Sequence, residues 1–274
     1  MAVNPDPGHE AWCVTTPVRR PDDTDVLRSV ATALDVLDCF AMDKELGVSE
    51  IAQRLGVAKS TAHRMLTTLL SRGLVERTQD GRYALGLHLH ELGQLAQARH
   101  TLRHRAMGVL RTLSNQTGLG VMLCVADGAD VVALDRVEPV GLIETLAHVG
   151  ARFPSHCTSA GKVLAAYNPA VAQARHRAGF LPRVPGGPRT DVEWERLLSE
   201  VRRKGHAHSS DEFVPGLASV AVPLFDTQRR VPAALLVLDH SGDADLTRRC
   251  VPAMIAAGRR IGMGDRPSRM SYSA

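Results

Sequence analysis

The chain lacks any apolar run long enough to cross a membrane, and its cysteines are not clustered. No part of the 274 residues approaches the ~20 consecutive apolar residues that a membrane-spanning helix needs. The five cysteines form no CxxC pair, and their odd number argues against both a disulfide framework and a zinc site. The first residues lack the basic-then-apolar order of a signal peptide. We therefore expect a cytoplasmic protein without a metal or a cofactor.

Familiar catalytic motifs are missing too. The chain has no Walker loop and no GxGxxG, HExxH or GxSxG stretch. His156 and Cys157 are adjacent, which suggests a nucleophile or metal ligands, but neighbouring residues of an extended segment point to opposite sides. Four histidines between residues 88 and 104 are irregularly spaced without acidic or thiol partners, as in a solvated basic helix. We do not expect an enzyme.

The overall charge is mild, but the basic residues are locally concentrated. A formal net charge of +4 is too small for a generally basic coat, so nucleic-acid binding must depend on a local patch. Residues 26–80 contain seven basic and seven acidic side chains. Within them, residues 58–75 contain Lys59, Arg64 and Arg72 and no acid. That segment is the candidate patch.

The same segment lies in a pattern typical of a winged helix-turn-helix, which docks in the DNA major groove. A helix at 49–55 is predicted to begin at Ser49 as its cap and to end at Gly56. A second helix follows at 58–72. Two short strands around a Gln-Asp-Gly turn then form the wing, at residues 74–77 and 82–85.

The second helix has an apolar side and a polar side. Its apolar residues recur at helical spacing and are expected in the core: Ala62, Met65, Leu66, Leu69 and Leu70. Arg64 lies in the middle of the opposite side, where a guanidinium reads guanine or clamps a phosphate. A plain solvated face is the alternative, and the lack of acids favours DNA. The predicted contacts to double-stranded DNA are Lys59, Ser60, Thr61, His63, Arg64, Thr67 and Thr68, with Arg82 in the wing.

The remaining pattern divides the chain into further parts. Residues 26–42 form an amphipathic helix, whose apolar positions, among them Leu27, Val30 and Leu34, are expected to complete the core of a DNA-binding domain at 25–86. Residues 87–100 form a linker helix. The predicted boundaries of the other parts are a disordered arm at 1–24, an effector domain at 101–264 and a flexible tail at 265–274.

From residue 118 the pattern changes to short apolar runs separated by turns. It predicts a hairpin turning at Asp127-Gly128, a strand at 141–147, and a second hairpin around Gln228. Helical periodicity appears at 158–167, 192–204 and 247–261. The fold class is therefore α+β, with a mostly antiparallel sheet, helices on one side of it and a concave face on the other.

These motifs together resemble the IclR (isocitrate lyase regulator) family, from about residue 26 to residue 261. The resemblance depends on AKSTAHRMLTTLLSRGLVE and GRYALG in the first half, and on ADGADVVALDRVE, VGARFPSHCTSAGKVLAAY, RRKGHAHSSDEFVPGLASVAVPLFD and AALLVL in the second. It implies a winged helix-turn-helix domain joined by a helix to a GAF-like effector domain. It also implies dimers, often paired as dimers of dimers, on an operator.

The resemblance further implies a pocket for a small carboxylic-acid effector. The matching positions are Leu142, Thr145, Phe153, Ser159, Ala160, Ser209, Leu217, Ser219, Leu236 and Leu238. The N–H groups of Ser159 and Ala160 open a helix and would hold the carboxylate. Many members have Asp at 209, Cys at 219 and Ser at 236 and 238. The more apolar set here favours an aromatic or longer-chain acid, although Leu236 and Leu238 also suit a plain sheet core.

One function of another class stays open. The chain is alternatively a small-molecule-binding or enzymatic GAF-like protein whose N-terminal domain only oligomerises. A dimerisation helix needs no basic, acid-free surface, so the Arg64 face favours the ligand-responsive transcriptional regulator.

Overall fold

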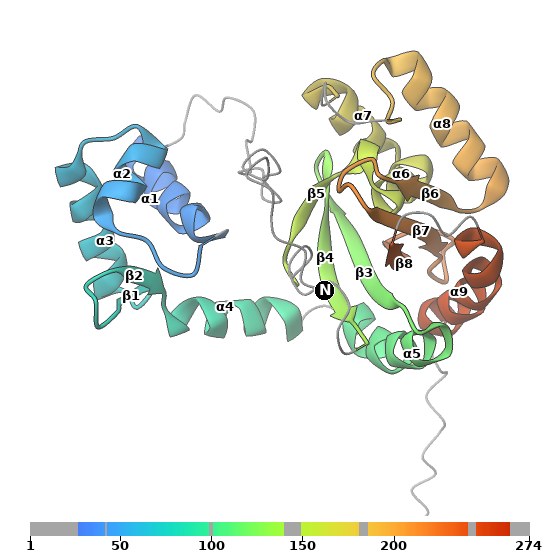
Figure 1. The fold of residues 1–274 in the computed structure, drawn as a ribbon, viewed down its shortest axis with the longest axis horizontal. Helices are drawn as coiled ribbons and strands as arrows, with labels where there is room; N and C mark the ends of the chain where they lie inside the picture. Colours follow the sequence, from blue (N-terminus) through green and yellow to red (C-terminus); the bar gives the residue numbers. More distant parts are fainter. Residues whose placement is uncertain are drawn as a thin grey trace, which may run out of the picture. The chain divides into compact units, whose positions relative to one another are not determined.

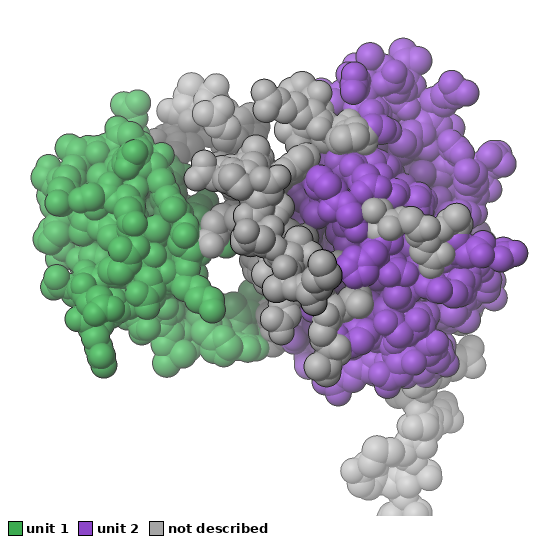
Figure 2. All heavy atoms as spheres, in the orientation of Figure 1, with its two compact units in different colours: residues 1–100 green, residues 101–274 purple. Residues whose placement is uncertain are grey.

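The structure, a computed structural model, describes residues 27–41, 43–98, 101–139, 149–180, 186–240 and 245–263. The arm at 1–24, the tail at 265–274 and the strand expected at 141–147 lie outside them. The chain divides into an N-terminal unit, residues 1–100, and a C-terminal unit, residues 101–274 (Figure 2). Each unit has its own hydrophobic core.

The N-terminal unit is a helical domain with a two-stranded wing (Figure 1). Its elements are α1 (Arg28–Asp38), the 3-10 turn η2 (Cys39–Ala41), α2 (Val48–Leu55), α3 (Lys59–Ser71), β1 (Val75–Arg77), β2 (Tyr83–Leu85) and α4 (Leu87–Ala98). Ile51, Ala62 and Leu66 are fully buried where α2 and α3 meet. Gly56 ends α2 in the left-handed conformation, with φ of 64°, as its predicted place in the turn requires. The helix-turn-helix prediction is confirmed.

The predicted start of α2, the first helix of the helix-turn-helix, is wrong by one residue. α2 begins at Val48 with Gly47 in the capping position, and Ser49 caps nothing. Glu50 takes that role, because its Oε2 accepts a hydrogen bond from the Gly47 N–H at 2.5 Å. A carboxylate at the start of a helix is also favoured by the helix dipole.

The apolar stripe expected to complete the core from α1 is also wrong in part. Phe40, which belongs to the predicted stripe, is buried, but Leu27, Val30 and Leu34 are 72%, 52% and 57% exposed. Val36, which the pattern did not assign to the stripe, is fully buried. Val30 and Leu34 are one turn apart and therefore share one face of α1, and Leu27 directly precedes that helix. Periodicity shows that a face is apolar, but it does not show what covers that face.

The C-terminal unit is built on one six-stranded antiparallel sheet, in the order β5-β4-β3-β8-β7-β6. Its strands are β3 (Gly120–Asp127), β4 (Asp130–Val137), β5 (Arg152–Pro154), β6 (Ala207–Ser210), β7 (Leu217–Leu224) and β8 (Ala233–His240). Its helices are α5 (Thr101–Thr117), η3 (Ser155–Cys157), α6 (Ser159–Tyr167), α7 (Pro169–Ala178), α8 (Asp191–Lys204) and α9 (Leu246–Met263). The α+β prediction is confirmed, although α7, β5 and β6 were not predicted.

Helices cover both faces of the sheet, not one as expected. α5 and α9 pack on one face, where Leu110 and Met254 meet Leu123 and Leu235 (Figure 1). α6 packs on the other face, against β7 and β8. The uninterrupted apolar run of β8 reflects this, because a strand buried on both faces needs no alternation with polar residues. The space available for a ligand therefore lies between the sheet and the start of α6.

Candidate nucleic-acid interface and ligand cavity

One face of α3 is exposed along its whole length. Ala62, Leu66 and Leu69 are buried on the core side, whereas Leu70, which the pattern also assigned to the core, is 39% exposed. The predicted contact residues on this helix all have exposed side chains: Lys59, Ser60, Thr61, His63, Arg64, Thr67 and Thr68. The structure thus places them together on one solvent-facing surface of a helix-turn-helix.

Hydrogen bonding divides these polar residues into two kinds. The hydroxyl groups of Thr67 and Thr68 donate to the carbonyls of His63 and Arg64, at 2.9 and 3.0 Å. Their donors are used within the helix, which leaves methyl groups and oxygen lone pairs for a partner. Lys59 and Arg64 make no ion pair within the described ranges. Within the described ranges their cationic groups are therefore free to bind a partner.

The wing residue Arg82 has a different environment from the other predicted contacts. Its guanidinium pairs with the Glu50 carboxylate, with Nη2 and Oε2 separated by 2.7 Å. The same nitrogen donates to the carbonyl of Glu45 at 3.1 Å. This pair could not be predicted from the sequence, because its two residues are far apart in the chain.

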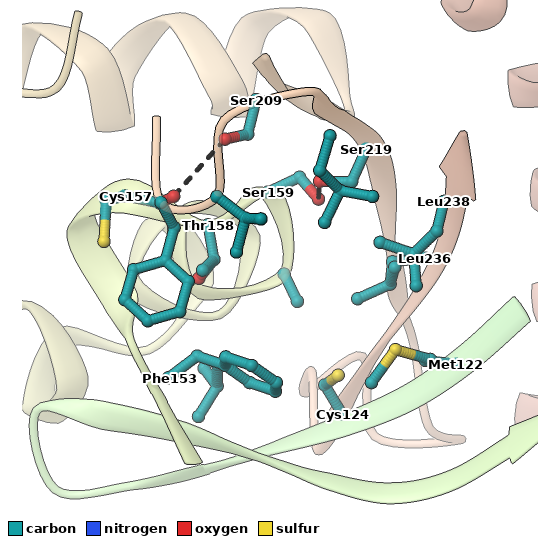
Figure 3. A pocket seen from close by; sticks show the side chains of 15 residues that line it. Met122, Cys124, Phe153, Cys157, Thr158, Ser159, Ser209, Ser219, Leu236 and Leu238 are labelled. Carbon is teal, nitrogen blue, oxygen red and sulfur yellow. Dashed lines mark hydrogen bonds between the residues drawn. The ribbon is translucent and has the colours of Figure 1, made fainter. Parts of the chain in front are cut away.

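The C-terminal unit contains a cavity between the sheet and the start of α6 (Figure 3). It holds about 560 Å³ of space free of atoms, including its open mouth. Alternate residues of β3 and β8 form its floor, because the residues between them point to the α5 and α9 side. The lining residues are Met122, Cys124, Val131, Phe153, Cys157, Thr158, Ser159, Ala160, Ser209, Phe213, Val214, Leu217, Ser219, Leu236 and Leu238.

The lining is apolar apart from four hydroxyl groups, and it contains no charged side chain. All four hydroxyls are already engaged, and that of Thr158 donates to the carbonyl of Pro154 at 2.9 Å. The Oγ atoms of Ser159 and Ser219 lie 2.7 Å apart, and Ser209 donates to the carbonyl of Cys157 at 3.3 Å (Figure 3). A ligand here would meet aromatic and aliphatic surface over most of its area. The first N–H groups of α6 are the nearest groups suited to an anion.

Two cysteines, Cys124 and Cys157, are among the residues that line the cavity. Burial raises the pKa of Cys124 to about 12, and burial together with the nearby Glu212 carboxylate raises the pKa of Cys157 to about 12. Both thiols are therefore neutral near pH 7, whereas nucleophilic catalysis needs the thiolate. The prediction that His156 and Cys157 lie in an extended segment was wrong, because both lie in the 3-10 turn η3.

The cavity wall formed by η3 is supported from behind by a buried polar network. Arg175 of α7 donates to Nδ1 of His156 at 3.0 Å and lies 3.6 Å from Asp130 of β4. Burial and the adjacent Arg175 lower the pKa of His156 to about 3. The imidazole is therefore neutral and accepts a hydrogen bond from a cation, so it is a structural support rather than a proton-transfer group.

The segment 211–216 closes another side of the cavity. Phe213 meets Phe153 edge to face, with ring centroids 5.8 Å apart. The neighbouring Glu212 pairs with the buried Lys162 of α6, at 2.5 Å between Oε1 and Nζ. Lys162 also donates to the carbonyl of His208 at 3.1 Å. This lysine therefore joins three segments around the cavity instead of facing a ligand.

The cavity brings together eight of the ten positions implied by the family resemblance. They are Phe153, Ser159, Ala160, Ser209, Leu217, Ser219, Leu236 and Leu238. Leu142 and Thr145 lie outside the described residues. Sequence reasoning missed Met122 and Cys124, because β3 is apolar on both faces. It also missed Phe213 and Val214, which follow no regular period.

Neither unit offers an obvious metal site or membrane anchor in the part of the chain that the structure describes. No three His, Cys, Asp or Glu side chains there gather to hold a metal ion. No described helix combines the length and the apolar character needed to span a membrane.

A winged helix-turn-helix and a second domain with a largely apolar cavity define the class of ligand-responsive DNA-binding regulators. Residues 29–79 match the IclR helix-turn-helix domain, and residues 94–261 match the family described as bacterial transcriptional regulator IclR C-terminal. The chain therefore belongs to the IclR family of transcriptional regulators, with a helix-turn-helix domain and a C-terminal effector domain.

Individual relatives agree with this assignment. The chain is 32% identical over 253 residues to the HTH-type transcriptional regulator XynR of Escherichia coli K12, covering 86% of this chain and 98% of XynR. An IclR transcriptional regulator from Alicyclobacillus acidocaldarius has a similar structure, with 29% identity and a TM-score of 0.73. The match covers 86% of this chain and 98% of that protein. An IclR homologue from Microbacterium hydrocarbonoxydans, solved with 4-hydroxybenzoate, is 27% identical with a TM-score of 0.73. The match covers 85% of this chain and 97% of the homologue.

Proposed function

We propose that this regulator binds an operator in double-stranded DNA through α3, as a dimer or a dimer of dimers, and that a small carboxylic acid in the cavity controls the binding. The observation that carries the proposal is the exposed face of α3. It presents Lys59 and Arg64, which make no ion pair among the described residues, and there is no acidic residue between positions 58 and 75. Such a face suits phosphates and guanine edges.

The proposed DNA contacts are the seven exposed residues of α3 named above. Lys59, Ser60 and Thr61 lie at the helix start, where no side chain caps the N–H groups and a phosphate is favoured. Arg64 lies one turn further along and is the proposed base reader. Thr67 and Thr68 use their hydroxyl donors within the helix, and their methyl groups suit contact with thymine.

The proposed ligand is an aromatic or longer-chain carboxylic acid. Its body would lie against Phe153, Leu217 and the leucines of β8, all of which line the cavity. Its carboxylate would lie at the N–H groups of Ser159 and Ala160. The 4-hydroxybenzoate complex of the Microbacterium homologue supports an aromatic acid as the first ligand to test.

The remaining parts of the proposal follow from the same surfaces. Exposed leucines on α1 and α4 suit pairing with a second copy of the chain, because apolar stripes of this kind are usually covered. A regulator of genes acts where the DNA is, so we place the protein in the cytoplasm, bound to the nucleoid when it occupies an operator. The neutral thiols of the cavity support a binding function rather than an enzymatic one.

A mobility-shift experiment with the full chain tests DNA binding directly. Labelled duplex from upstream of the protein's own gene should shift at lower protein concentration than a random duplex of equal length. Addition of 4-hydroxybenzoate or related acids should change the shift in one direction. Equal binding to both duplexes, or to neither, would contradict operator recognition.

The variant Ala160→Trp tests the proposed ligand site. Ala160 is buried at the cavity wall, so an indole there would occupy the ligand space. We expect unchanged operator affinity and loss of the ligand response, because a ligand acts only through its different affinity for the two DNA-binding states. Ala178→Trp, at an exposed position of α7, is the matched control. An unchanged response in Ala160→Trp, measured by fluorescence anisotropy, would move the site elsewhere.

A further inference from the structure

The wing of the N-terminal unit is fastened to the start of α2 at several points. Oε2 of Glu50 accepts hydrogen bonds from the Gly47 N–H at 2.5 Å and from Arg82 at 2.7 Å. Arg82 also donates to the carbonyl of Glu45 at 3.1 Å. The main chains of Leu46 and Tyr83 exchange two further hydrogen bonds, both of 2.9 Å. Residues 45–50 and 82–83 therefore form one connected network.

The network uses the cation that a wing would otherwise offer to DNA. The Arg82 guanidinium is only partly exposed, at 40%, and an acidic partner lies directly on it. A phosphate at this place would have to displace Glu50 or tolerate its negative charge. Lys59 and Arg64 carry no such partner within the described ranges. Arg82 is thus the one predicted contact whose surroundings oppose a phosphate.

The same network fixes the wing relative to the recognition helix. α2 and α3 share the buried residues Ile51, Ala62 and Leu66, so they form one rigid body. A wing tied to the first turn of α2 is therefore held at a set position beside α3. Ordering a wing before DNA arrives removes an entropy cost that binding would otherwise include.

We propose that Glu50 and Arg82 are positioning residues for DNA binding, which hold the wing in its binding position without contacting DNA. This inference depends on the proposed function. It predicts that removing the negative charge of Glu50, an acidic residue near DNA, weakens DNA binding. Simple electrostatics requires the opposite, since fewer negative charges on a protein favour association with phosphates.

The test compares Glu50→Gln, Arg82→Gln and the double variant in the full-length protein. Glu76→Gln, at an exposed position of β1 without an ion pair in the described residues, is the matched control for loss of an acid. Affinity for the upstream duplex and for a random duplex is measured by anisotropy at several salt concentrations. Thermal unfolding of each variant shows that the helical unit stays folded.

We expect Glu50→Gln and Arg82→Gln each to weaken binding about 1.5-fold to fivefold, the range for losing one partly exposed ion pair. The double variant should bind DNA as tightly as the single variant with the lower affinity, because both substitutions break the same contact. The slope of log affinity against log salt should match that of the wild type. Glu76→Gln should bind as tightly as the wild type or more tightly.

Two results would overturn the inference. One is Glu50→Gln binding DNA as tightly as the wild type or better. The other is Arg82→Gln lowering the salt slope by about one, the loss expected for one phosphate contact. If the wild type shifts neither duplex, the proposed function fails and this inference fails with it. If Arg64→Ala weakens operator binding while Glu50→Gln does not, only the inference fails.

Discussion

Arg64 and Lys59 lie on one exposed face of α3, and we expect them to contribute to DNA binding in different ways. Arg64→Ala should weaken operator binding by about 1–3 kcal/mol, the range for a bidentate contact with a base. Lys59→Ala should weaken operator and random DNA alike and reduce the salt dependence, because a phosphate contact carries no sequence information. Anisotropy titrations on both duplexes at matched salt distinguish these outcomes.

Two results would contradict the roles assigned to Arg64 and Lys59. Operator binding by Arg64→Ala at wild-type strength would show that another face of the unit reads the bases. A loss in Lys59→Ala limited to one operator base pair would make Lys59 a base reader instead.

His156 makes the stability of the C-terminal unit depend on pH. Its pKa is about 3 in the folded protein, against 6.5 for an ordinary histidine, because of burial and Arg175. Below pH 6.5 the unfolded chain therefore binds a proton that the folded chain does not, so stability falls as the pH decreases through this window. From pH 7 to pH 5 the loss should be about 2 kcal/mol. Urea unfolding at the two pH values measures it.

His156→Gln is the control for this effect. Glutamine can still accept the hydrogen bond from Arg175, but it does not titrate. The variant should lose most of the difference between pH 7 and pH 5. The same pH dependence in wild type and variant would assign the effect to other groups.

At the scale of elements, the contact between α6 and η3 controls the shape of the cavity. Gly161 of α6 lies against the backbone of Ser155, and an added Cβ would collide with it. Gly161→Ala should therefore displace η3, destabilise the unit by about 1–3 kcal/mol and weaken ligand binding. Denaturant unfolding and ligand titration measure the two effects.

Gly108→Ala is the matched control, because a Cβ at this position of α5 meets no atom within 4 Å. It should leave the ligand response unchanged and increase stability slightly, since alanine favours a helix over glycine. If Gly161→Ala behaved in the same way, the tight contact at η3 would have no role in forming the cavity.

Elements with strong local signals were predictable from the sequence, and those fixed by distant contacts were not. The residue types at Gly56 and at the Asp127-Gly128 turn indicate the local backbone conformation. The helix-turn-helix and the first hairpin were therefore predicted at the right places in the chain. β6 is a short strand of four partly polar residues, and it forms only because it pairs with β7. The ion pair between Glu50 and Arg82 likewise has no sequence signature.

The ligand cavity shows the same division. Its position near Ser159 and Ala160 came from the family resemblance, and the structure brings the matching residues together. The contribution of β3 was missed because β3 is apolar on both faces, so composition alone does not tell Met122 from the core residue Leu123.

At the scale of the whole molecule, the exposed stripe of α1 bears on oligomeric state. Leu34 is 57% exposed and shares its face with Val30. If this face pairs two chains as proposed, Leu34→Glu should convert the wild-type dimer or tetramer to smaller particles and weaken operator binding strongly. Light scattering at micromolar concentration measures the mass.

Val192→Glu provides the control, because Val192 is 79% exposed on α8 of the other unit. It should leave the mass and the DNA affinity unchanged. A monomeric wild type would remove the dimer from the proposal, and a fully dimeric Leu34→Glu would place the interface on another surface.

The neutral thiols of the cavity bear on oxidative stress. Peroxides attack thiolates, and a thiol of pKa about 12 is ionised in only about one molecule in a hundred thousand at pH 7. Cys124 and Cys157 therefore resist oxidation while lining a site open to small molecules. An oxidising shock would leave these two side chains unchanged, so the ligand site would keep its shape under conditions that inactivate a thiolate-based sensor.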